Sequence, residues 1–186
     1  MTKLPDVPAP GGRLDPDLDF QSLNVAVLTV SDTRTPETDT SGDLLVARIE
    51  EAGHKVIRRT ILRDDIQGVR AGVKDWIDDG EVDVVISTGG TGLTGRDITP
   101  EAVTPLFDKR IEGFDMVWHT VSYQSVGLST MLSRACAGVA NGTVIFCLPG
   151  SNGACKDGWD KIIRWQLDSR HKPCNLVDLM PRLKEV

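Results

Sequence analysis

The chain has 186 residues, of which 40% are hydrophobic and 26% are charged, and this suffices for one domain with a sizeable core. Its formal net charge of −6 argues against a general nucleic-acid-binding or membrane-binding surface. No apolar run reaches the roughly 18 residues of a transmembrane helix, and the acidic, proline-rich N-terminus lacks the apolar stretch of a secretory signal.

The N-terminal segment differs in composition from the rest of the chain. Proline and glycine recur throughout residues 1–20, which can bury little surface. This composition predicts a flexible N-terminal arm, or alternatively an arm that packs on a neighbouring subunit. Residues 21–186 are predicted to form the folded domain.

Four apolar runs are predicted as strands, because nearly continuous Val, Ile and Leu suit a sheet that is covered on both faces. The runs are Asn24–Val30, Lys55–Leu62, the stretch with Val84-Val85-Ile86, and Thr143–Leu148. Apolar residues at helical spacing predict helices at residues 41–52, 66–79, 99–107, 114–122 and 154–168, the first capped by Ser41. No element is assigned to residues 134–140, and the tail from His171 is expected to be irregular.

Strands that alternate with amphipathic helices predict a three-layer α/β/α sandwich with a mainly parallel sheet. Ligands of such sheets bind at the carboxyl ends of the strands. Acids follow the first two strands, and glycines follow the other two: the segments are Ser31-Asp32, Asp64-Asp65, Gly89–Asp97 and Pro149–Gly153. We therefore expect the four strand ends to converge on one crevice.

The segment after the third strand predicts a phosphate-binding loop. It holds Gly89, Gly90, Gly92 and Gly95 and leads to Thr99-Pro100-Glu101, which resembles a helix start capped by Thr99. Backbone N–H groups approach an anion closely where no Cβ intervenes, and the helix dipole favours negative charge. A plain glycine-rich connection is the alternative.

Two familiar nucleotide motifs fit this loop poorly. Gly90, Gly92 and Gly95 match the GxGxxG pattern of dinucleotide-binding folds, but here the pattern follows the third strand rather than the first. A P-loop would need a lysine and a Ser or Thr where this chain has Arg96 and Asp97. Both a nicotinamide-dependent oxidoreductase and a P-loop enzyme are therefore disfavoured.

Asp64 and Asp97 are the candidate catalytic carboxylates. Acids beside a phosphate site repel the anion unless a cation intervenes, and Mg²⁺ binds one or two carboxylates together with phosphate oxygens. Asp97 could instead cap the following helix, and Asp64 or Asp65 could stand in a solvated turn. Asp32 could bind a ribose or a metal, or it could form an Asx turn.

Other polar and aromatic residues carry weaker signals. Ser122, Ser129 and Ser133 could donate hydrogen bonds to a phosphate, although serine is also an ordinary loop residue. No GxSxG motif and no histidine near these serines support nucleophilic catalysis. The four tryptophans are expected in the core or at subunit contacts.

The four cysteines are widely spaced and form no CxxC pair. Cys136, Cys147 and Cys155 stand in apolar or helical contexts, as buried reduced thiols do, so we expect a cytoplasmic protein without disulfides. His171 and Cys174 form an HxxC motif, but no second pair accompanies it, which argues against a zinc site.

Several motifs together resemble the MoaB/MogA family of molybdopterin-binding proteins. They are TVSD at Thr29–Asp32, TGGTG at Thr88–Gly92, RDITPEA at Arg96–Ala102, LSRACAGVANGT at Leu132–Thr143 and LPGS at Leu148–Ser151. The resemblance extends from about Asn24 to Arg182, and its C-terminal part is more similar to MoaB-type than to MogA-type members. It implies the molybdopterin-binding fold of that family.

The resemblance also implies an activity. Active members transfer AMP from ATP to the terminal phosphate of molybdopterin and release pyrophosphate, with Mg²⁺ as the cofactor. The family's two functional aspartates match Asp64 and Asp97, which would also hold Mg²⁺.

The binding residues follow from the same resemblance. Its molybdopterin contacts match Thr88, Gly89, Gly90, Thr91, Gly92 and Ser133, with Ser122 matching across a one-residue gap. The nucleotide is expected at Ser31, Asp32, Pro149, Gly150 and Ser151. Cys147 stands where some members carry Asn, so that one contact is expected to differ.

MoaB-type members are hexamers, arranged as a dimer of trimers, and MogA-type members are trimers. We therefore expect a homo-hexamer, or alternatively a homotrimer, that acts alongside other molybdenum cofactor enzymes. The main alternative to a molybdopterin adenylyltransferase is a non-catalytic molybdopterin-binding protein of the same pathway, because some MoaB-type proteins coexist with a MogA that performs the reaction.

Overall fold

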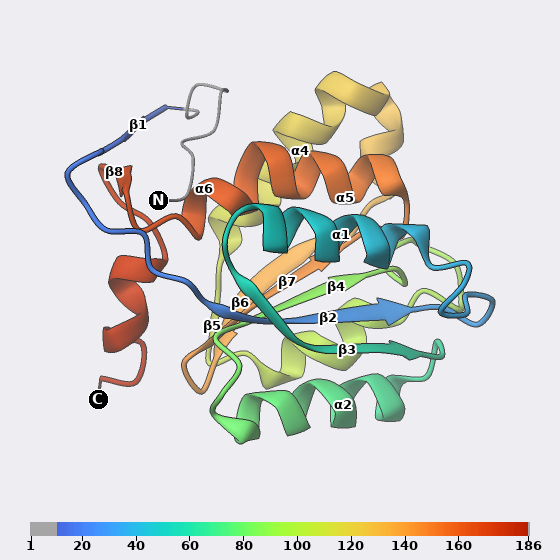
Figure 1. Cartoon of the computed structure of the whole chain (residues 1–186). Helices are drawn as coiled ribbons and strands as arrows, with labels where there is room; N and C mark the ends of the chain where they lie inside the picture. The colour runs from blue at the N-terminus through green and yellow to red at the C-terminus, as the bar shows by residue number, and fades with distance from the viewer. Residues whose placement is uncertain (1–10, 186) are drawn as a thin grey trace.

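The computed structural model describes residues 11–185, which are built around a six-stranded sheet in the order β3-β2-β4-β7-β6-β5 (Figure 1). Four strands run parallel: β3 (Lys55–Leu62), β2 (Asn24–Val30), β4 (Val84–Thr88) and β7 (Thr143–Leu148). Next to them, β6 (Cys136–Ala140) runs antiparallel to β7 and pairs with the short β5 (Lys109–Arg110). The four predicted strands and their parallel arrangement are confirmed.

Helices cover both faces of the sheet (Figure 1). One face carries α1 (Thr40–Glu51), α4 (Glu112–Val126) and α5 (Asn152–Gly158), which continues through a π-helical turn, Trp159–Ile163, into α6 (Arg164–Gln166). The other face carries α2 (Ile66–Asp79) and α3 (Thr99–Val103). Successive residues of β2 point to opposite faces of the sheet. Val25 and Val27 pack in the core under α1, α4 and α5, and Ala26 and Leu28 pack in the second core, under α2 and α3. This is the predicted three-layer α/β/α sandwich.

The strand β6 is the longest of the strands that the sequence does not predict, and its residues, CAGVA, are mostly small rather than β-branched. The structure explains their size. A Cβ at Gly138 would lie 2.3 Å from the ring of Phe107, so this ring packs directly on the strand backbone. Close packing, rather than β propensity, decides this element.

Two helix starts differ from the expected ones. The N-cap of α1 is Asp39, whose carboxylate accepts the Gly42 N–H at 3.0 Å, so the predicted Ser41 cap is wrong. The N-cap position of α3 is occupied by Ile98 rather than by Thr99, and no side chain caps this helix. The Thr99 hydroxyl is engaged elsewhere, in the loop that precedes the helix.

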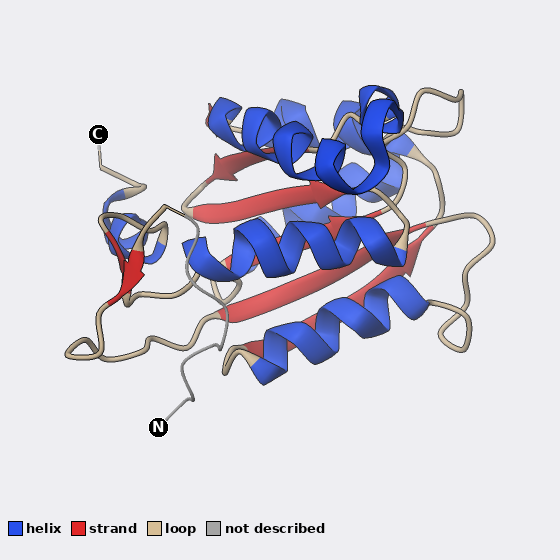
Figure 2. Ribbon diagram, turned by 90° about the horizontal axis from the view of Figure 1, so that it is seen from above, coloured by secondary structure: helices blue, strands red, loops and turns tan. Residues whose placement is uncertain are grey.

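Residues 11–20 are bound to the C-terminal segment. The two-stranded sheet of β1 (Arg13–Leu14) and β8 (His171–Lys172) lies at one end of the molecule (Figure 2). The Ser169 hydroxyl also donates to the carbonyl oxygen of Asp19 at 2.8 Å. Part of the predicted arm is therefore docked on its own chain, whereas residues 1–10 lie outside the described residues. The tail predicted as irregular contains β8 and a 3₁₀ helix, Val177–Arg182.

Within residues 11–185, no helix is long and apolar enough to cross a membrane. The four cysteines are free thiols, of which Cys174 is exposed and Cys136, Cys147 and Cys155 are buried. No group of three or more His, Cys, Asp or Glu side chains in the same range is placed to hold a metal ion by itself.

Candidate functional site

The carboxyl ends of β3, β2, β4 and β7 lie side by side at one edge of the sheet (Figure 1). Backbone hydrogen bonds join neighbouring ends. The Ser31 N–H donates to the Leu62 carbonyl oxygen at 2.8 Å, and the Gly89 N–H donates to that of Leu148 at 2.9 Å. The four polar strand ends therefore meet in one region, as the sequence predicts.

Glycine is required at the first two positions of the loop after β4. Gly89 and Gly90 have φ angles of 104° and 65°, and a Cβ at Gly89 would lie 2.2 Å from the Val30 carbonyl oxygen. Thr99 ties the loop from the other side. Its hydroxyl donates to the Gly89 carbonyl oxygen at 2.8 Å, and its N–H donates to that of Gly90 at 2.9 Å. The loop is thus fixed against the sheet.

Two backbone donors of this loop are unpaired. The N–H groups of Gly90 and Thr91 donate to no other described residue. Adjacent N–H groups in a left-handed glycine turn form a concave site for an anion. The loop therefore has the donors that a phosphate group needs.

Arg134 braces the far half of the loop. Its Nε donates to the Gly92 carbonyl oxygen at 2.7 Å, its Nη2 donates to that of Asp97 at 2.8 Å, and Nη1 forms an ion pair with Glu101. The sequence analysis did not single out Arg134, although it directly follows the candidate Ser133. Its guanidinium donates hydrogen bonds to carbonyl groups of the loop, so Arg134 stabilises the loop conformation.

Asp97 is held inside the loop. Its Oδ2 accepts the Thr94 N–H at 2.9 Å and the Thr94 hydroxyl at 2.6 Å. Burial favours the neutral acid, but the hydrogen bonds from Thr94 and Gly92 and the charge of Arg134 outweigh it and lower the pKa of Asp97. The carboxylate is ionised and braces a turn of the loop, which differs from the helix cap considered as its alternative role.

Asp64 is less fully engaged. Its Oδ2 accepts the Asp32 N–H at 2.9 Å, while Oδ1 faces Gly90 and accepts no hydrogen bond from the described residues. Burial raises the pKa of Asp64, and the negative charges of Asp32 and Asp97 raise it further. A half-buried carboxylate with a free oxygen and acidic neighbours would be relieved by a cation.

Asp32 and Arg96 connect this carboxylate to the loop. Asp32 Oδ1 accepts the Asp64 N–H at 3.3 Å, and Asp32 Oδ2 accepts Arg96 Nε at 2.9 Å. The hydrogen bond from Arg96 is the largest cause of the lowered pKa of Asp32. Arg96, which replaces the lysine of a P-loop, is thus paired with an acid in this structure.

A cavity of about 460 Å³ opens between the loop, α4 and the start of α5, and we call it the serine cavity. Seven residues that the sequence suggests for binding line it: Thr91, Gly92, Ser122, Ser129, Ser133, Pro149 and Ser151. Trp118 forms part of its wall and donates from Nε1 to the Ser133 hydroxyl at 3.2 Å. Ser125 and Asp157 also line it, and the sequence analysis did not single them out.

Predicted contacts that do not line the serine cavity include Thr88 and Gly150, and Cys147, where some family members carry Asn, also lies away from it. Thr88 is fully buried, and its hydroxyl donates to the Pro149 carbonyl oxygen at 3.1 Å, so the side chain positions the loop. Gly150 packs against Gly89, where a Cβ at Gly150 would lie 3.2 Å from the Gly89 Cα. Cys147 is buried within the second core, under α2 and α3, away from the serine cavity.

A second cavity, of about 690 Å³, lies at the ends of β2 and β3, and we call it the arginine cavity. Its lining includes Ser31 and Asp32, as predicted for a nucleotide site, and three arginines: Arg34, Arg59 and Arg63. The Ser31 hydroxyl accepts the N–H groups of Thr33 and Arg34, both at 3.2 Å, which fixes the turn at the cavity mouth.

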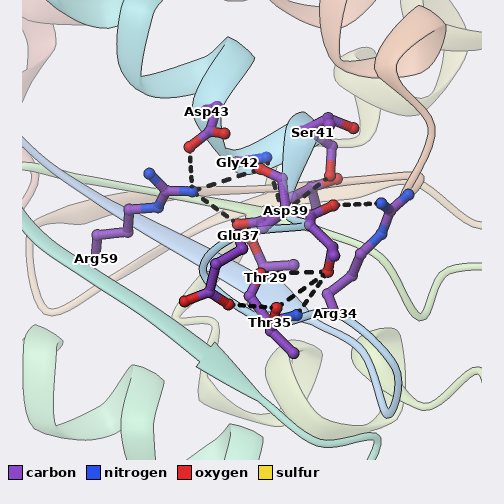
Figure 3. A network of polar contacts seen from close by, with 12 residues as sticks. Thr29, Arg34, Thr35, Glu37, Asp39, Ser41, Gly42, Asp43 and Arg59 are labelled. Carbon is purple, nitrogen blue, oxygen red and sulfur yellow. Dashed lines mark hydrogen bonds and ion pairs between the residues drawn. The ribbon is translucent and has the colours of Figure 1, made fainter.

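The wall of the arginine cavity is held by a network around Asp39 (Figure 3). The fully buried Asp39 carboxylate accepts the Thr29 hydroxyl at 2.8 Å and Arg59 Nη2 at 3.0 Å. Burial opposes ionisation of Asp39, but the hydrogen bonds from Arg59, Thr29 and Gly42 lower its pKa. Arg59 is therefore neutralised by its own chain and is a structural cation.

The other two arginines of this cavity differ from Arg59. Arg34 donates to the carbonyl oxygen of Thr38, which leaves its charge uncompensated by an acid (Figure 3). The Arg63 guanidinium forms no hydrogen bond or ion pair with any described residue, although the Arg63 carbonyl oxygen accepts the Asp65 N–H at 2.7 Å. Arg63 is exposed and lies next to Asp64 in the chain, so it is available for an anionic ligand.

Fold and site together define an α/β protein with a glycine-rich loop and two cavities at the carboxyl edge of a mainly parallel sheet. The family model described as "Probable molybdopterin binding domain" matches residues 26–169. Molybdenum cofactor biosynthesis protein B of Escherichia coli K12 is 47% identical over 167 residues, which cover 90% of this chain and 96% of that protein.

Solved structures agree with this comparison. A crystal structure of a molybdenum cofactor biosynthesis protein B is 43% identical, with a TM-score of 0.77 over 79% of this chain and 92% of that one. A structure of MogA is 30% identical, with a TM-score of 0.69 over 75% of this chain and 91% of that one. The chain therefore belongs to the MoaB/MogA family of molybdopterin-binding domain proteins, and this membership supports a role in molybdenum cofactor biosynthesis.

Proposed function

We propose that this protein transfers AMP from ATP to the terminal phosphate of molybdopterin and releases pyrophosphate. The observation that carries the proposal is the glycine loop, whose unpaired N–H groups at Gly90 and Thr91 lie between two cavities and beside the free Oδ1 of Asp64. Such a loop suits a phosphate acceptor, and the adjacent carboxylate suits a cation on a nucleotide. Family membership supports molybdopterin as the acceptor.

The order of the strands supports an in-line reaction. The arginine cavity lies at the ends of β3 and β2, the glycine loop follows β4, and the serine cavity adjoins the end of β7. We assign molybdopterin to the serine cavity, with Ser122 and Ser133 near its phosphate, and ATP to the arginine cavity. The terminal phosphate of molybdopterin would then attack the α-phosphate of ATP from the serine cavity. Pyrophosphate would leave toward the arginine cavity, where the Arg63 side chain is an unpaired cation. Catalysis is then mainly positioning and charge neutralisation.

The residues present fit Mg²⁺ bound jointly with ATP. Asp64 offers one unshared oxygen, and its raised pKa reflects the burial and repulsion that a cation would offset. Asp97 faces the same loop, but Thr94 already occupies its Oδ2, so we assign Asp64 the larger share of the binding. Since the described residues hold no three-ligand cluster, phosphate oxygens and water would complete the coordination. Bound Mg²⁺ would neutralise charge that develops on the phosphates.

For two residues, the ligand proposed from the structure differs from the one that the sequence predicts. Pro149 and Ser151, which the sequence analysis expects at the nucleotide, line the serine cavity together with Ser133. We therefore propose that they contact molybdopterin. Ser31 and Asp32 remain on the nucleotide side because both line the arginine cavity.

A second candidate function is molybdopterin binding without catalysis. The observation that favours it is the engagement of Asp97 by Thr94, which makes this carboxylate a brace of the loop. In that case the serine cavity and the glycine loop would be used, and the arginine cavity would not.

One experiment separates the two functions. Purified protein is incubated with molybdopterin and Mg²⁺–ATP, and adenylylated molybdopterin is measured by mass spectrometry. We expect product from the unmodified protein and none from Asp64→Asn, which should still bind molybdopterin. Binding without product, under conditions in which a MogA control is active, would overturn the enzyme proposal and leave the binding function.

We also propose that the chain forms a homo-oligomer, a hexamer or a trimer, through the surface of α4 and the 3₁₀ helix Gly127–Leu132. Large apolar side chains are exposed there, with Met116 at 73%, Leu128 at 72% and Met131 at 72%. Exposed apolar patches of this kind mark interaction sites, and this one adjoins the serine cavity through Leu132. A second copy of the chain is the occupant we propose, and light scattering of Met131→Asp, expected to dissociate, tests it.

The proposed setting is the cytoplasm, where other molybdenum cofactor enzymes would supply molybdopterin and use the adenylylated product. The free thiols support a reducing compartment, because Cys136, Cys147 and Cys155 are all unpaired. Co-fractionation of the native protein with a cytoplasmic marker tests this setting.

A further inference from the structure

Two buried cysteines lie opposite each other on neighbouring strands. Cys136 of β6 and Cys147 of β7 are direct register partners in an antiparallel pair. Residues opposite each other in such a pair have Cα atoms about 4.5–5.5 Å apart, within the range of about 4.4–6.8 Å that disulfides span. Both side chains belong to the same core, under α2 and α3, so they point to the same face of the sheet. The backbone therefore already places the two thiols for a bond.

One of the two cysteines borders a polar cavity, although only 1% of its surface is exposed. Cys136 lines a cavity of about 370 Å³, together with Arg110, His119 and Arg134. Cys147 is fully buried beside it. A small polar oxidant in this cavity would thus meet Cys136 first, with Cys147 in contact behind it.

The environment divides the roles of the two thiols. A hydrogen bond from Cys147 lowers the pKa of Cys136, and Arg110 and Arg134 act in the same direction, against burial and the charge of Asp115. The same hydrogen bond and complete burial raise the pKa of Cys147 well above its usual value. Cys136 is therefore the better nucleophile, and Cys147 is a thiol held next to it.

We propose that Cys136 and Cys147 form an oxidation site for small hydroperoxides and close to an intramolecular disulfide. The Cys136 sulfur attacks one oxygen of hydrogen peroxide, the O–O bond breaks, and the departing hydroxide takes the thiol proton and becomes water. The Cys147 sulfur then displaces the hydroxyl of the resulting sulfenic acid, which leaves as a second water. Two thiols and one peroxide thus give one disulfide and two waters.

The position of this site links it to the rest of the molecule. Cys136 lies two residues after Arg134, which supports the glycine loop, and Cys147 lies two residues before Pro149, which lines the serine cavity. Neither thiol lines the serine or the arginine cavity. The inference therefore stands independently of the adenylyl transfer proposed above.

The chain contains its own comparison thiols. Cys155 is also buried, but burial raises its pKa to about 11, and its sulfur contacts the Thr88 hydroxyl instead of another thiol. Cys174 is exposed. Cys155 therefore reports on oxidation in the core without a partner thiol, and Cys174 reports on oxidation at the surface.

The test uses the full chain. Reduced protein is treated with a few equivalents of hydrogen peroxide, alkylated under denaturing conditions and mapped by mass spectrometry without reduction. We expect a peptide that joins Cys136 to Cys147, lost after dithiothreitol, while Cys155 is alkylated as before treatment. Recovery of both Cys136 and Cys147 as free thiols while Cys174 is oxidised would overturn the proposal, as would Cys136 sulfinic acid without the disulfide.

Variants sharpen the assignment of roles. In Cys147→Ala, oxidation should stop at a sulfenic acid on Cys136, which dimedone traps, and in Cys174→Ala the disulfide should form as in the unmodified protein. If Cys147→Ala fails to fold, the mapping of the unmodified protein and of Cys174→Ala still decides. Loss of the disulfide in Cys174→Ala would show that Cys174, rather than the buried pair, is the primary thiol.

Discussion

The two ends of the parallel strands differ in how their polar groups are used. Before β2 and β3, polar groups pair within the chain: Asp168 and Arg170 form a buried ion pair at 2.7 Å, and the Leu23 N–H donates to His54 Nδ1 at 3.2 Å. After the same strands, Asp64 Oδ1 and the Arg63 guanidinium have no partner among the described residues. We call the first end the closed end, because these polar groups pair within the chain. We call the second the open end, because two of its charged side chains keep groups that could contact a ligand.

The contrast extends to the two candidate carboxylates at the open end. Asp97 accepts two hydrogen bonds from Thr94 at Oδ2, and its pKa is lowered, whereas Asp64 accepts one from Asp32, and its pKa is raised. A carboxylate with few hydrogen bonds and a raised pKa carries a cost that a bound cation would offset. The difference in hydrogen bonding and pKa, rather than residue type, is why Asp64 is the one proposed to bind the cation.

The largest expected effect is on adenylyl transfer when Asp64 or Asp97 is substituted. Asp64→Asn should reduce adenylyl transfer by on the order of 10³-fold, because it removes the charge that binds Mg²⁺–ATP. Molybdopterin affinity and melting temperature should change little. Asp97→Ala should instead weaken both transfer and molybdopterin affinity, because the loop loses the acceptor for Thr94. Kinetics and binding titration of both variants measure this, and identical profiles would remove the distinction.

The next prediction concerns the rigidity of the open end. Gly89→Ala should destabilise the protein by roughly 3–4 kcal/mol, because its φ is 104° and the added Cβ would meet the Val30 carbonyl oxygen. Gly95→Ala is the matched control, since nothing lies within 4 Å of a Cβ there. Urea denaturation of both variants checks this. Equal midpoints would show that the loop yields more easily than the geometry indicates.

A third prediction concerns the closed end and acid. Burial lowers the pKa of His54 from its usual value of 6.5 to about 4. His54 is thus neutral when folded and takes up a proton on unfolding below pH 6.5, so its contribution to stability is complete above that pH. As pH falls from 6.5 to 4, about 3 kcal/mol of stability should be lost. Urea denaturation across this range measures the loss, which should be much smaller in His54→Asn.

The smallest expected effect tests the cation at the open end. Arg63→Ala should raise the KM for ATP about five- to tenfold, or roughly 1 kcal/mol, because an exposed cation contributes modestly to phosphate binding. Arg58→Ala in the preceding strand β3 is the control, since Arg58 pairs with Asp79 at 2.9 Å. Steady-state kinetics measure both variants, and equal shifts would indicate a general charge effect.

Several features of the open end could be predicted from the sequence because they depend on residues close in the chain. The apolar runs identify β2, β3, β4 and β7, and alternation with helices implies a parallel sheet whose carboxyl ends meet. The glycines after β4 and the acid after β3 could then be chosen as a phosphate loop and a carboxylate. These inferences need only local patterns and one rule of topology.

The remaining features depend on contacts between distant residues. Arg134 supports the loop from 42 residues away, at Gly92, and Asp39 holds Arg59 from 20 residues away. Gly138 of β6 is in contact with Phe107, which lies 31 positions earlier in the chain. No sequence pattern predicts that the pKa of Asp64 is raised and that of Asp97 lowered, because both are acids in a segment that follows a strand.

The sequence by itself determined the layered fold, the edge at which ligands bind and the loop that suits a phosphate, because strand periodicity and glycine placement are local properties. Only the tertiary structure decided which acid has a raised pKa, which arginine side chain stays unpaired among the described residues and which two cysteines face each other. Those outcomes depend on which polar groups satisfy one another across the fold, and that pairing is fixed only when the strands take their places in the sheet.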